Sequence, residues 1–219
     1  MIIASYVFFG LFALCSFIHL IFCFLEKEKA RKISKIFCVT LLAIAAILYK
    51  PNAPLIYVGA FLGVIGDIFL IFKKNIKSFF VGTIFFIGGH VLYLTQAILL
   101  INPNSALHWS VYLVVGLILL LLTFGLYPIT GKKLGPTALI GNFYMPFLLV
   151  LLSLGIYLSV VNNNYLPGLL FACGYLSFFI SDSTLIYTSF FKDIKRRDFY
   201  IMLFYLIAQA LIITGLLLA

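Results

Sequence analysis

Charge is scarce in this 219-residue sequence. Only 10% of its residues are Asp, Glu, Lys or Arg, while 64% are hydrophobic, and the mean hydropathy is +1.21. A soluble domain of this size has no use for so much apolar surface, so the composition excludes one. It predicts an all-α integral membrane protein in which the bilayer replaces water as the solvent.

Cysteine and histidine are also rare. The four cysteines lie in apolar stretches and form no CxxC pair, which favours free thiols over a disulfide framework or a zinc site. The three histidines are His19, His90 and His108, and His108 falls in a polar loop. We therefore expect no metal and no other cofactor. The first apolar stretch lacks a basic start and a small-residue cleavage site, so we interpret it as a retained helix.

Apolar stretches near 20 residues long, separated by charge or by Pro, Asn and Gly, predict eight membrane spans. They form a single bundle and a single domain covering residues 1–219, because the connectors are short and no soluble segment interrupts them. The predicted spans are residues 2–25, 33–49, 54–72, 78–101, 109–127, 137–161, 166–191 and 199–219.

Basic residues are distributed one-sidedly between these spans. The first, third, fifth and seventh connectors hold 14 of the 15 Lys and Arg residues when the first is counted from Glu26 to Lys35, and the other connectors hold only Lys50. The positive-inside rule then places the odd connectors in the cytoplasm and both termini on the other side. The net charge of +9 is thus a topology signal that also attracts anionic lipid. No basic helix or aromatic ladder supports nucleic-acid binding, which we exclude.

Acidic residues number only six, and four of them fall in the basic connectors. The other two, Asp67 and Asp182, lie inside hydrophobic spans. An ionisable group in a membrane span is energetically costly, so both are candidates for function. The plainer interpretation is that each aspartate is a structural polar group hydrogen-bonded to a Ser or Tyr.

Other polar residues fall at similar depths. With a rise of about 1.5 Å per residue, the two aspartates, His19 and His90 lie at the middle or inner levels of their spans. Gly59, Gly63 and Asp67 share one helix face, which turns Asp67 into the bundle. We expect a polar cavity open towards the cytoplasmic side. The candidate supporting residues are His19, Lys35, His90, Tyr93, Asn142, Tyr205 and Gln209.

Four motifs carry a family resemblance over nearly the whole chain. They are Gly66–Asp67, then Phe79/Phe80–Gly82 followed by His90–Tyr93, then Ser181–Asp182, then Tyr205–Gln209. In this order they resemble the YhhN family of membrane proteins, which includes the lysoplasmalogenases. Ser34–Lys35 is similar to the basic start of the family's second helix, with Ile36 where a proline is common. The resemblance implies an eight-helix membrane hydrolase that cleaves the vinyl ether bond of lysoplasmalogens.

Vinyl ether hydrolysis suits a pair of carboxylates. A proton goes to the β-carbon, and water attacks the resulting oxocarbenium ion, which leads to a fatty aldehyde and a glycerophospholipid head. One protonated and one ionised carboxyl group serve these steps, as at glycosidic bonds. We predict that Asp67 and Asp182 form this pair, with His90 orienting one of them or sharing its proton. Tyr93, Asn142, Tyr205 and Gln209 would place water or the head group, and Lys35 would meet the lipid phosphate.

Three other functions stay open. A proton- or cation-coupled transporter would use the same two aspartates as carriers, and Pro146 offers a place to break a helix. A zinc-dependent membrane amidase such as an alkaline ceramidase needs three histidines at one depth, which His108 does not share. A non-catalytic lipid-binding or scaffold protein is the third. The partners we expect are a lysophospholipid and membrane lipid, and the compact chain suits a bacterial plasma membrane. Oligomeric state and head-group preference are not specified by the sequence.

Overall fold

The apolar stretches form long helices in the computed structural model, which describes residues 1–71, 76–101, 137–161 and 164–219 and a few isolated positions between 117 and 128. Within these residues there are seven helices and no strands. All seven helices are long and apolar enough to cross a membrane, which makes the protein a multi-pass membrane protein. Their bounds are α1 Ile2–Phe24, α2 Glu28–Tyr49, α3 Pro54–Ile71, α4 Ile76–Leu99, α7 Thr137–Val161, α8 Tyr165–Phe190 and α9 Arg197–Leu218.

Six of the seven helices begin and end within about two residues of the predicted spans. The exception is α2, which begins at Glu28 and not at residue 33. The prediction was wrong there because a membrane helix extends beyond the apolar core into the polar interface, where charged residues are tolerated. Arg31, Lys32 and Lys35 therefore lie on one helix, and their spacing places Arg31 and Lys35 on the same face.

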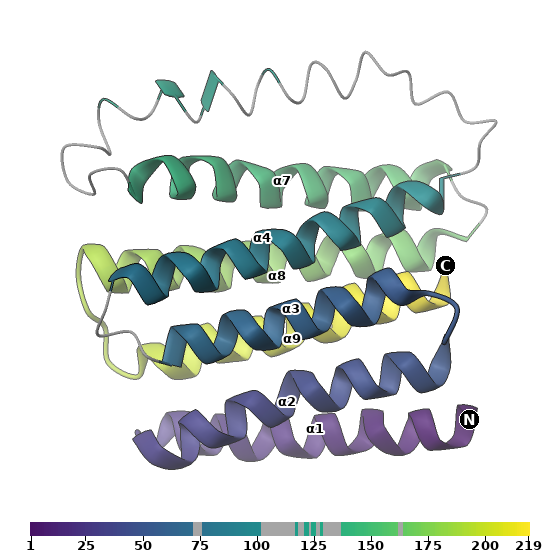
Figure 1. The fold of residues 1–219 in the computed structure, drawn as a ribbon, viewed down its shortest axis with the longest axis horizontal. Helices are drawn as coiled ribbons and strands as arrows, with labels where there is room; N and C mark the ends of the chain where they lie inside the picture. Colours follow the sequence, from purple (N-terminus) through teal and green to yellow (C-terminus); the bar gives the residue numbers. More distant parts are fainter. Residues whose placement is uncertain are drawn as a thin grey trace.

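The fifth predicted span, residues 109–127, lies outside the continuously described residues, as do Lys73, Lys74, His108, Lys132 and Lys133. The count of eight spans therefore stays a prediction. The end of α4 and the start of α7 lie at opposite ends of the bundle, as an additional span between them would require (Figure 1).

Helices that follow one another in the sequence pack as antiparallel neighbours, in the pairs α1–α2, α3–α4, α7–α8 and α8–α9 (Figure 1). Helix α9 also contacts α1, α2, α3 and α4, so it occupies the centre of the described bundle. Both chain termini lie at one end, opposite the α1–α2 and α8–α9 connections (Figure 1). The assignment of that end to the non-cytoplasmic side stays a prediction.

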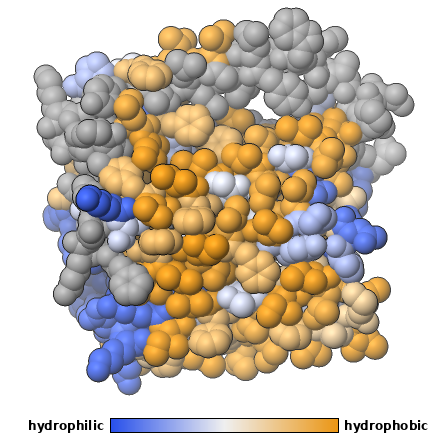
Figure 2. Space-filling model, in the orientation of Figure 1, coloured by the Kyte–Doolittle hydropathy of each residue, from blue (hydrophilic) through white to orange (hydrophobic). Residues whose placement is uncertain are grey.

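Hydropathy divides the surface as expected for a membrane protein. Figure 2 shows a broad hydrophobic face over the helices and a gathering of hydrophilic residues at the end that carries the α1–α2 and α8–α9 connections. Pro146 lies within α7, which continues from Thr137 to Val161 without interruption. The broken helix that would have favoured a transporter is therefore not present in α7.

Glycines bring α3 and α4 into direct backbone contact. A Cβ added to Gly59 would lie 2.7 Å from the Tyr93 ring, and one added to Gly89 would lie 2.8 Å from the carbonyl oxygen of Gly59. A Cβ added to Gly66 would lie 2.9 Å from the Phe86 ring. Any larger residue would push the helices apart at these positions. This close approach sets the rotation of α3 and so directs Asp67, beside Gly66, into the bundle.

Candidate functional site

Asp67 is buried on α3 and holds two polar partners from other helices. Lys35 Nζ of α2 lies 2.8 Å from Asp67 Oδ1, and the Tyr205 hydroxyl of α9 donates a hydrogen bond of 2.7 Å to Asp67 Oδ2. The Asp67 side chain is 2% exposed and that of Lys35 is 16% exposed. Three helices thus meet at one ion pair, and both carboxylate oxygens are engaged.

Asp182 is buried on α8 and has a different kind of partner. The Tyr144 hydroxyl of α7 donates a hydrogen bond of 2.6 Å to Asp182 Oδ2. The neighbouring Ser181 donates instead to the carbonyl oxygen of Ile201 on α9, at 3.0 Å. Among the described residues, no protein atom pairs with Asp182 Oδ1. One aspartate is therefore paired with a cation, and the other is held by a neutral phenol.

His90 of α4 lies among aromatic side chains beside the site. Its Nδ1 lies 3.1 Å from the Tyr175 hydroxyl, and its Nε2 lies 3.5 Å from the Tyr144 hydroxyl. The ring of Phe178 packs against the imidazole edge to face, with centroids 4.6 Å apart. His90 therefore contacts neither carboxylate directly and reaches Asp182 through Tyr144. The predicted orienting role of His90 needs this tyrosine as an intermediate.

Both aspartates line one cavity of about 150 Å³ at the end of the bundle where α1 and α8 end and α2 and α9 begin. Its polar wall includes Lys35, Tyr144 and Tyr205, and the side towards the connections includes Arg31 and Arg197. The apolar wall is formed by Leu70, Ile71, Phe79, Phe80, Leu185 and Ile186. The cavity opens at the basic end of the bundle, where the sequence predicted a polar opening.

The other predicted supporting residues divide into two groups. His19 lines the cavity and is bonded to its own neighbours, with Nδ1 2.7 Å from Ser34 Oγ and Nε2 3.4 Å from Cys23 Sγ. Tyr93, Asn142 and Gln209 are buried but do not line the cavity.

Two polar atoms of that second group are unsatisfied. Within the described part of the chain, the Tyr93 hydroxyl and Gln209 Oε1 are buried without a hydrogen-bond partner. An ordered water is the usual partner of such a group. The roles of all the predicted site residues in catalysis stay predictions.

Tyr144 is the residue that sequence reasoning missed. It lies in α7, where the sequence drew attention to Asn142, and it is one of 13 tyrosines. The available signal was helical spacing. Ile140, Gly141 and Tyr144 fall on one face of α7, and that face lines the cavity.

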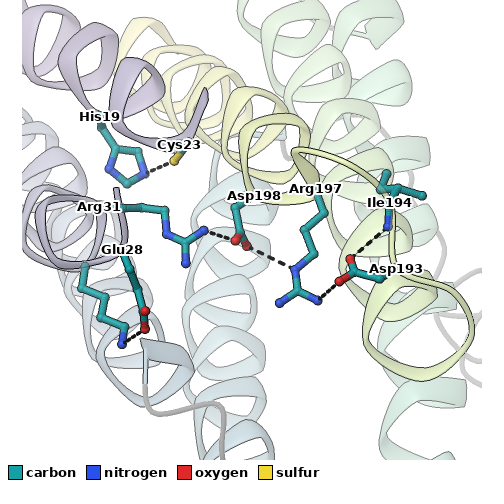
Figure 3. Close-up of polar contacts among 9 residues, drawn as sticks. His19, Cys23, Glu28, Arg31, Asp193, Ile194, Arg197 and Asp198 are labelled. Carbon is teal, nitrogen blue, oxygen red and sulfur yellow. Dashed lines mark hydrogen bonds and ion pairs between the residues drawn. The ribbon is translucent and has the colours of Figure 1, made fainter. Parts of the chain in front are cut away.

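The mouth of the cavity carries a chain of ion pairs (Figure 3). Arg31 of α2 pairs with Asp198 of α9, Arg197 Nε lies 3.8 Å from Asp198 Oδ1, and Arg197 also pairs with Asp193 at 3.3 Å. The sequence had placed Asp193 and Asp198 in a connector without a function. This chain of pairs joins the start of α2 to the start of α9 at the mouth of the cavity.

Within the described residues, no group of three or more His, Cys, Asp or Glu side chains could hold a metal ion. His19 bonds to Ser34 and Cys23, whereas His90 lies among tyrosines, so the two do not share a site. This arrangement argues against the three-histidine site of a zinc amidase. The absence of a cofactor stays a prediction.

Comparison with known proteins gives one result. No match was found among curated proteins or among solved structures. The model of the YhhN family matches residues 30–216, which include both aspartates and every residue that lines the cavity except His19. The chain belongs to the YhhN family.

Proposed function

We propose that this protein is a membrane hydrolase that cleaves the vinyl ether bond of lysoplasmalogens and releases a fatty aldehyde and a glycerophospholipid head. The observation that carries the proposal is a pair of buried carboxyl groups with unlike partners on one cavity. The resemblance to a family that includes lysoplasmalogenases supports the same reaction. The predicted bacterial plasma membrane is part of this proposal.

The unlike partners suggest which carboxyl group does what. Asp67 lies against the Lys35 ammonium group, which compensates a negative charge, so we assign it the ionised role. Among the described residues, Asp182 has one hydrogen-bond partner, the Tyr144 hydroxyl on Oδ2. A proton on Oδ1 would then face the cavity and be available to a substrate. Two carboxyl groups in unlike surroundings are the arrangement that acid catalysis of this kind needs.

The reaction follows from these roles. Asp182 transfers its proton to the β-carbon of the vinyl ether, and positive charge develops on the adjacent carbon and the ether oxygen. The Asp67 carboxylate stabilises that charge electrostatically. Water adds to the cationic carbon and returns a proton to Asp182. The resulting hemiacetal collapses when its C–O bond to glycerol breaks. The glycerol oxygen gains a proton, and the hemiacetal hydroxyl loses one as it becomes the aldehyde.

The cavity wall suits a lipid with one chain. The apolar side chains of Leu70, Phe79, Phe80 and Leu185 offer a surface for the alkenyl chain beside the two aspartates. A lysolipid can enter sideways from the leaflet while its head stays at the basic end of the bundle. The product aldehyde, also a single chain, leaves by the same route.

A second candidate is favoured by the Lys35–Asp67 pair. An ion pair inside a membrane bundle is typical of proton- or cation-coupled transporters. A transporter would take up a solute in proteoliposomes and release no aldehyde. A metal-free hydrolase would release aldehyde and take up no solute.

The test is aldehyde release by the purified full chain. The substrate is 1-alkenyl lysophosphatidylethanolamine, and the saturated 1-alkyl analogue is the chemical control. We expect aldehyde from the alkenyl lipid only, with loss of activity in both Asp67→Asn and Asp182→Asn. Ser177→Ala, on α8 but outside the cavity, is the matched control and should keep full activity.

Two outcomes contradict the proposal in different ways. Activity that survives both aspartate substitutions would leave the hydrolase and remove the carboxylate mechanism. No aldehyde from the folded wild-type protein would remove the hydrolase and favour the transporter or a lipid-binding protein. Thermal unfolding of each variant shows whether a lost activity reflects a lost fold.

A further inference from the structure

Two arginines at the mouth of the cavity converge on one carboxylate. Arg31 comes from α2 and Arg197 from the first turn of α9, and both pair with Asp198 (Figure 3). All three residues line the buried cavity and also a second, polar recess of about 660 Å³ at the same end of the bundle. Any polar head that enters the buried cavity from the recess passes these side chains.

Paired guanidinium groups are the usual protein partners of a phosphate. Their forked donors match the oxygens of a phosphate or carboxylate, and binding is strongest where two such groups converge. In the structure, the carboxylate of Asp198 takes that position between them. The side chains of Arg31, Arg197 and Asp198 are 24%, 35% and 20% exposed. Solvent therefore reaches the cluster, and an ion pair of this kind can exchange one anion for another.

The position of Arg31 also fits the length of a lysophospholipid. Arg31 and Lys35 lie four residues apart on α2, about 6 Å along the helix axis. Lys35 binds Asp67 in the buried cavity, so Arg31 lies one turn closer to the mouth. A glycerol backbone spans a similar distance between its phosphate and its ether oxygen. A phosphate at Arg31 would therefore leave the ether bond near the two aspartates.

We propose that Arg31 and Arg197 form the binding site for the phosphate of a lysophospholipid, and that Asp198 is a built-in competitor that occupies this site in the unbound protein. This inference rests on the proposed function for the identity of the lipid. It adds the residues that bind the head and predicts that removal of an acidic residue strengthens binding. When the phosphate arrives, it takes the guanidinium groups, and the Asp198 carboxylate turns towards the water of the polar recess.

The test measures binding and needs no hydrolysis. The probe is the uncleavable 1-alkyl lysophosphatidylethanolamine, titrated calorimetrically into the detergent-purified full chain. We expect Asp198→Asn to tighten binding about three- to tenfold, and Arg31→Gln or Arg197→Gln to weaken it about tenfold, as for loss of one charge-assisted hydrogen bond. Lys192→Gln is the matched control for charge, because Lys192 is exposed in the α8–α9 connection and lines neither cavity.

Two further measurements keep the result interpretable. The double variant Arg31→Gln/Asp198→Asn removes both charges of the Arg31–Asp198 pair, so it should fold even if Arg31→Gln does not. We expect it to bind the probe about tenfold more weakly than Asp198→Asn alone. A 1-O-alkylglycerol, which has the same chain but no phosphate, should bind all variants equally.

The proposal is overturned if Asp198→Asn weakens binding or leaves it unchanged, or if the alkylglycerol shows the same changes as the phospholipid. Absence of probe binding to the folded wild type overturns it as well. Inorganic phosphate that binds as tightly as the lipid would assign the arginines to a free phosphate and overturn the lipid assignment. If the probe binds as expected and no aldehyde forms from the alkenyl lipid, the phosphate site stands and the proposed reaction fails.

Discussion

The buried Lys35–Asp67 pair gives the sharpest test of how this bundle is held together. We consider Lys35→Met, which keeps most of the side-chain volume and removes the charge. The ammonium group lies 2.8 Å from a carboxylate that is only 2% exposed. Removal of one partner of a buried ion pair leaves an uncompensated charge in the bundle and costs about 3–5 kcal/mol. We expect the free energy of unfolding to fall by about 3 kcal/mol, because the site still has the Tyr205 hydrogen bond.

The two partners should not be equivalent. Lys35 is 16% exposed, and its long side chain can extend towards the polar mouth when Asp67 is replaced. The Asp67 side chain is short and buried, so it cannot reach solvent when Lys35 is replaced. We therefore expect Asp67→Asn to cost about 1–2 kcal/mol, less than Lys35→Met. The double variant should lie closer to the wild type than the sum of the single changes, with a coupling of about 2 kcal/mol.

The assay is unfolding by denaturing detergent in mixed micelles, with helix content as the readout. Lys32→Met is the matched control: it removes the same charge from α2, but Lys32 pairs with Glu28 where the two side chains are 41% and 67% exposed. An exposed pair contributes about 0–1 kcal/mol. If Lys35→Met and Lys32→Met destabilise the protein equally, the buried ion pair does not stabilise the bundle and the argument fails.

Three further outcomes are expected. Tyr144→Phe removes the hydrogen bond to Asp182 and should lower kcat by about tenfold or more while KM changes little; an unchanged kcat would show that this hydrogen bond does not serve the reaction. His90 reaches Asp182 through that tyrosine, so the effect of His90→Phe on kcat should be the smaller of the two, and a larger effect would show that His90 acts directly. Gly89→Ala should destabilise the protein by about 1–3 kcal/mol because its Cβ would meet a backbone oxygen at 2.8 Å, whereas Gly10→Ala has nothing within 4 Å and should be neutral or stabilising in the same unfolding assay.

Much of the fold could be predicted from the sequence because membrane helices follow a simple rule. A bilayer needs about 20 apolar residues per span, so the bounds of six described helices agree with the prediction to within about two residues. The wrong start predicted for α2 came from the same rule, because a hydropathy pattern detects the apolar core of a span and not the helical turns at the membrane interface. The two aspartates that line the cavity, Asp67 and Asp182, could be picked out from the sequence because a carboxylate is rare in an apolar stretch.

The contacts between side chains of different helices could not be predicted in the same way. A soluble helix shows its buried face by alternating polar and apolar residues, but these helices are apolar on nearly every side, so the sequence does not reveal which residues face which neighbour. Tyr144 illustrates the problem. It is one tyrosine among 13, and only the packing of α7 against α8 brings its hydroxyl to Asp182.

The sequence by itself determined that the chain spans a membrane repeatedly and that two carboxyl groups lie within its apolar helices. Both follow from local composition and from the fixed rise of a helix. Only the tertiary structure decided that Lys35 pairs with Asp67, that a tyrosine holds Asp182, and that Arg31 and Arg197 share Asp198 at the mouth of the cavity. These pairings depend on how each helix is rotated against its neighbours. Close contacts such as Gly59 against Gly89 set that rotation, and they join residues far apart in the chain.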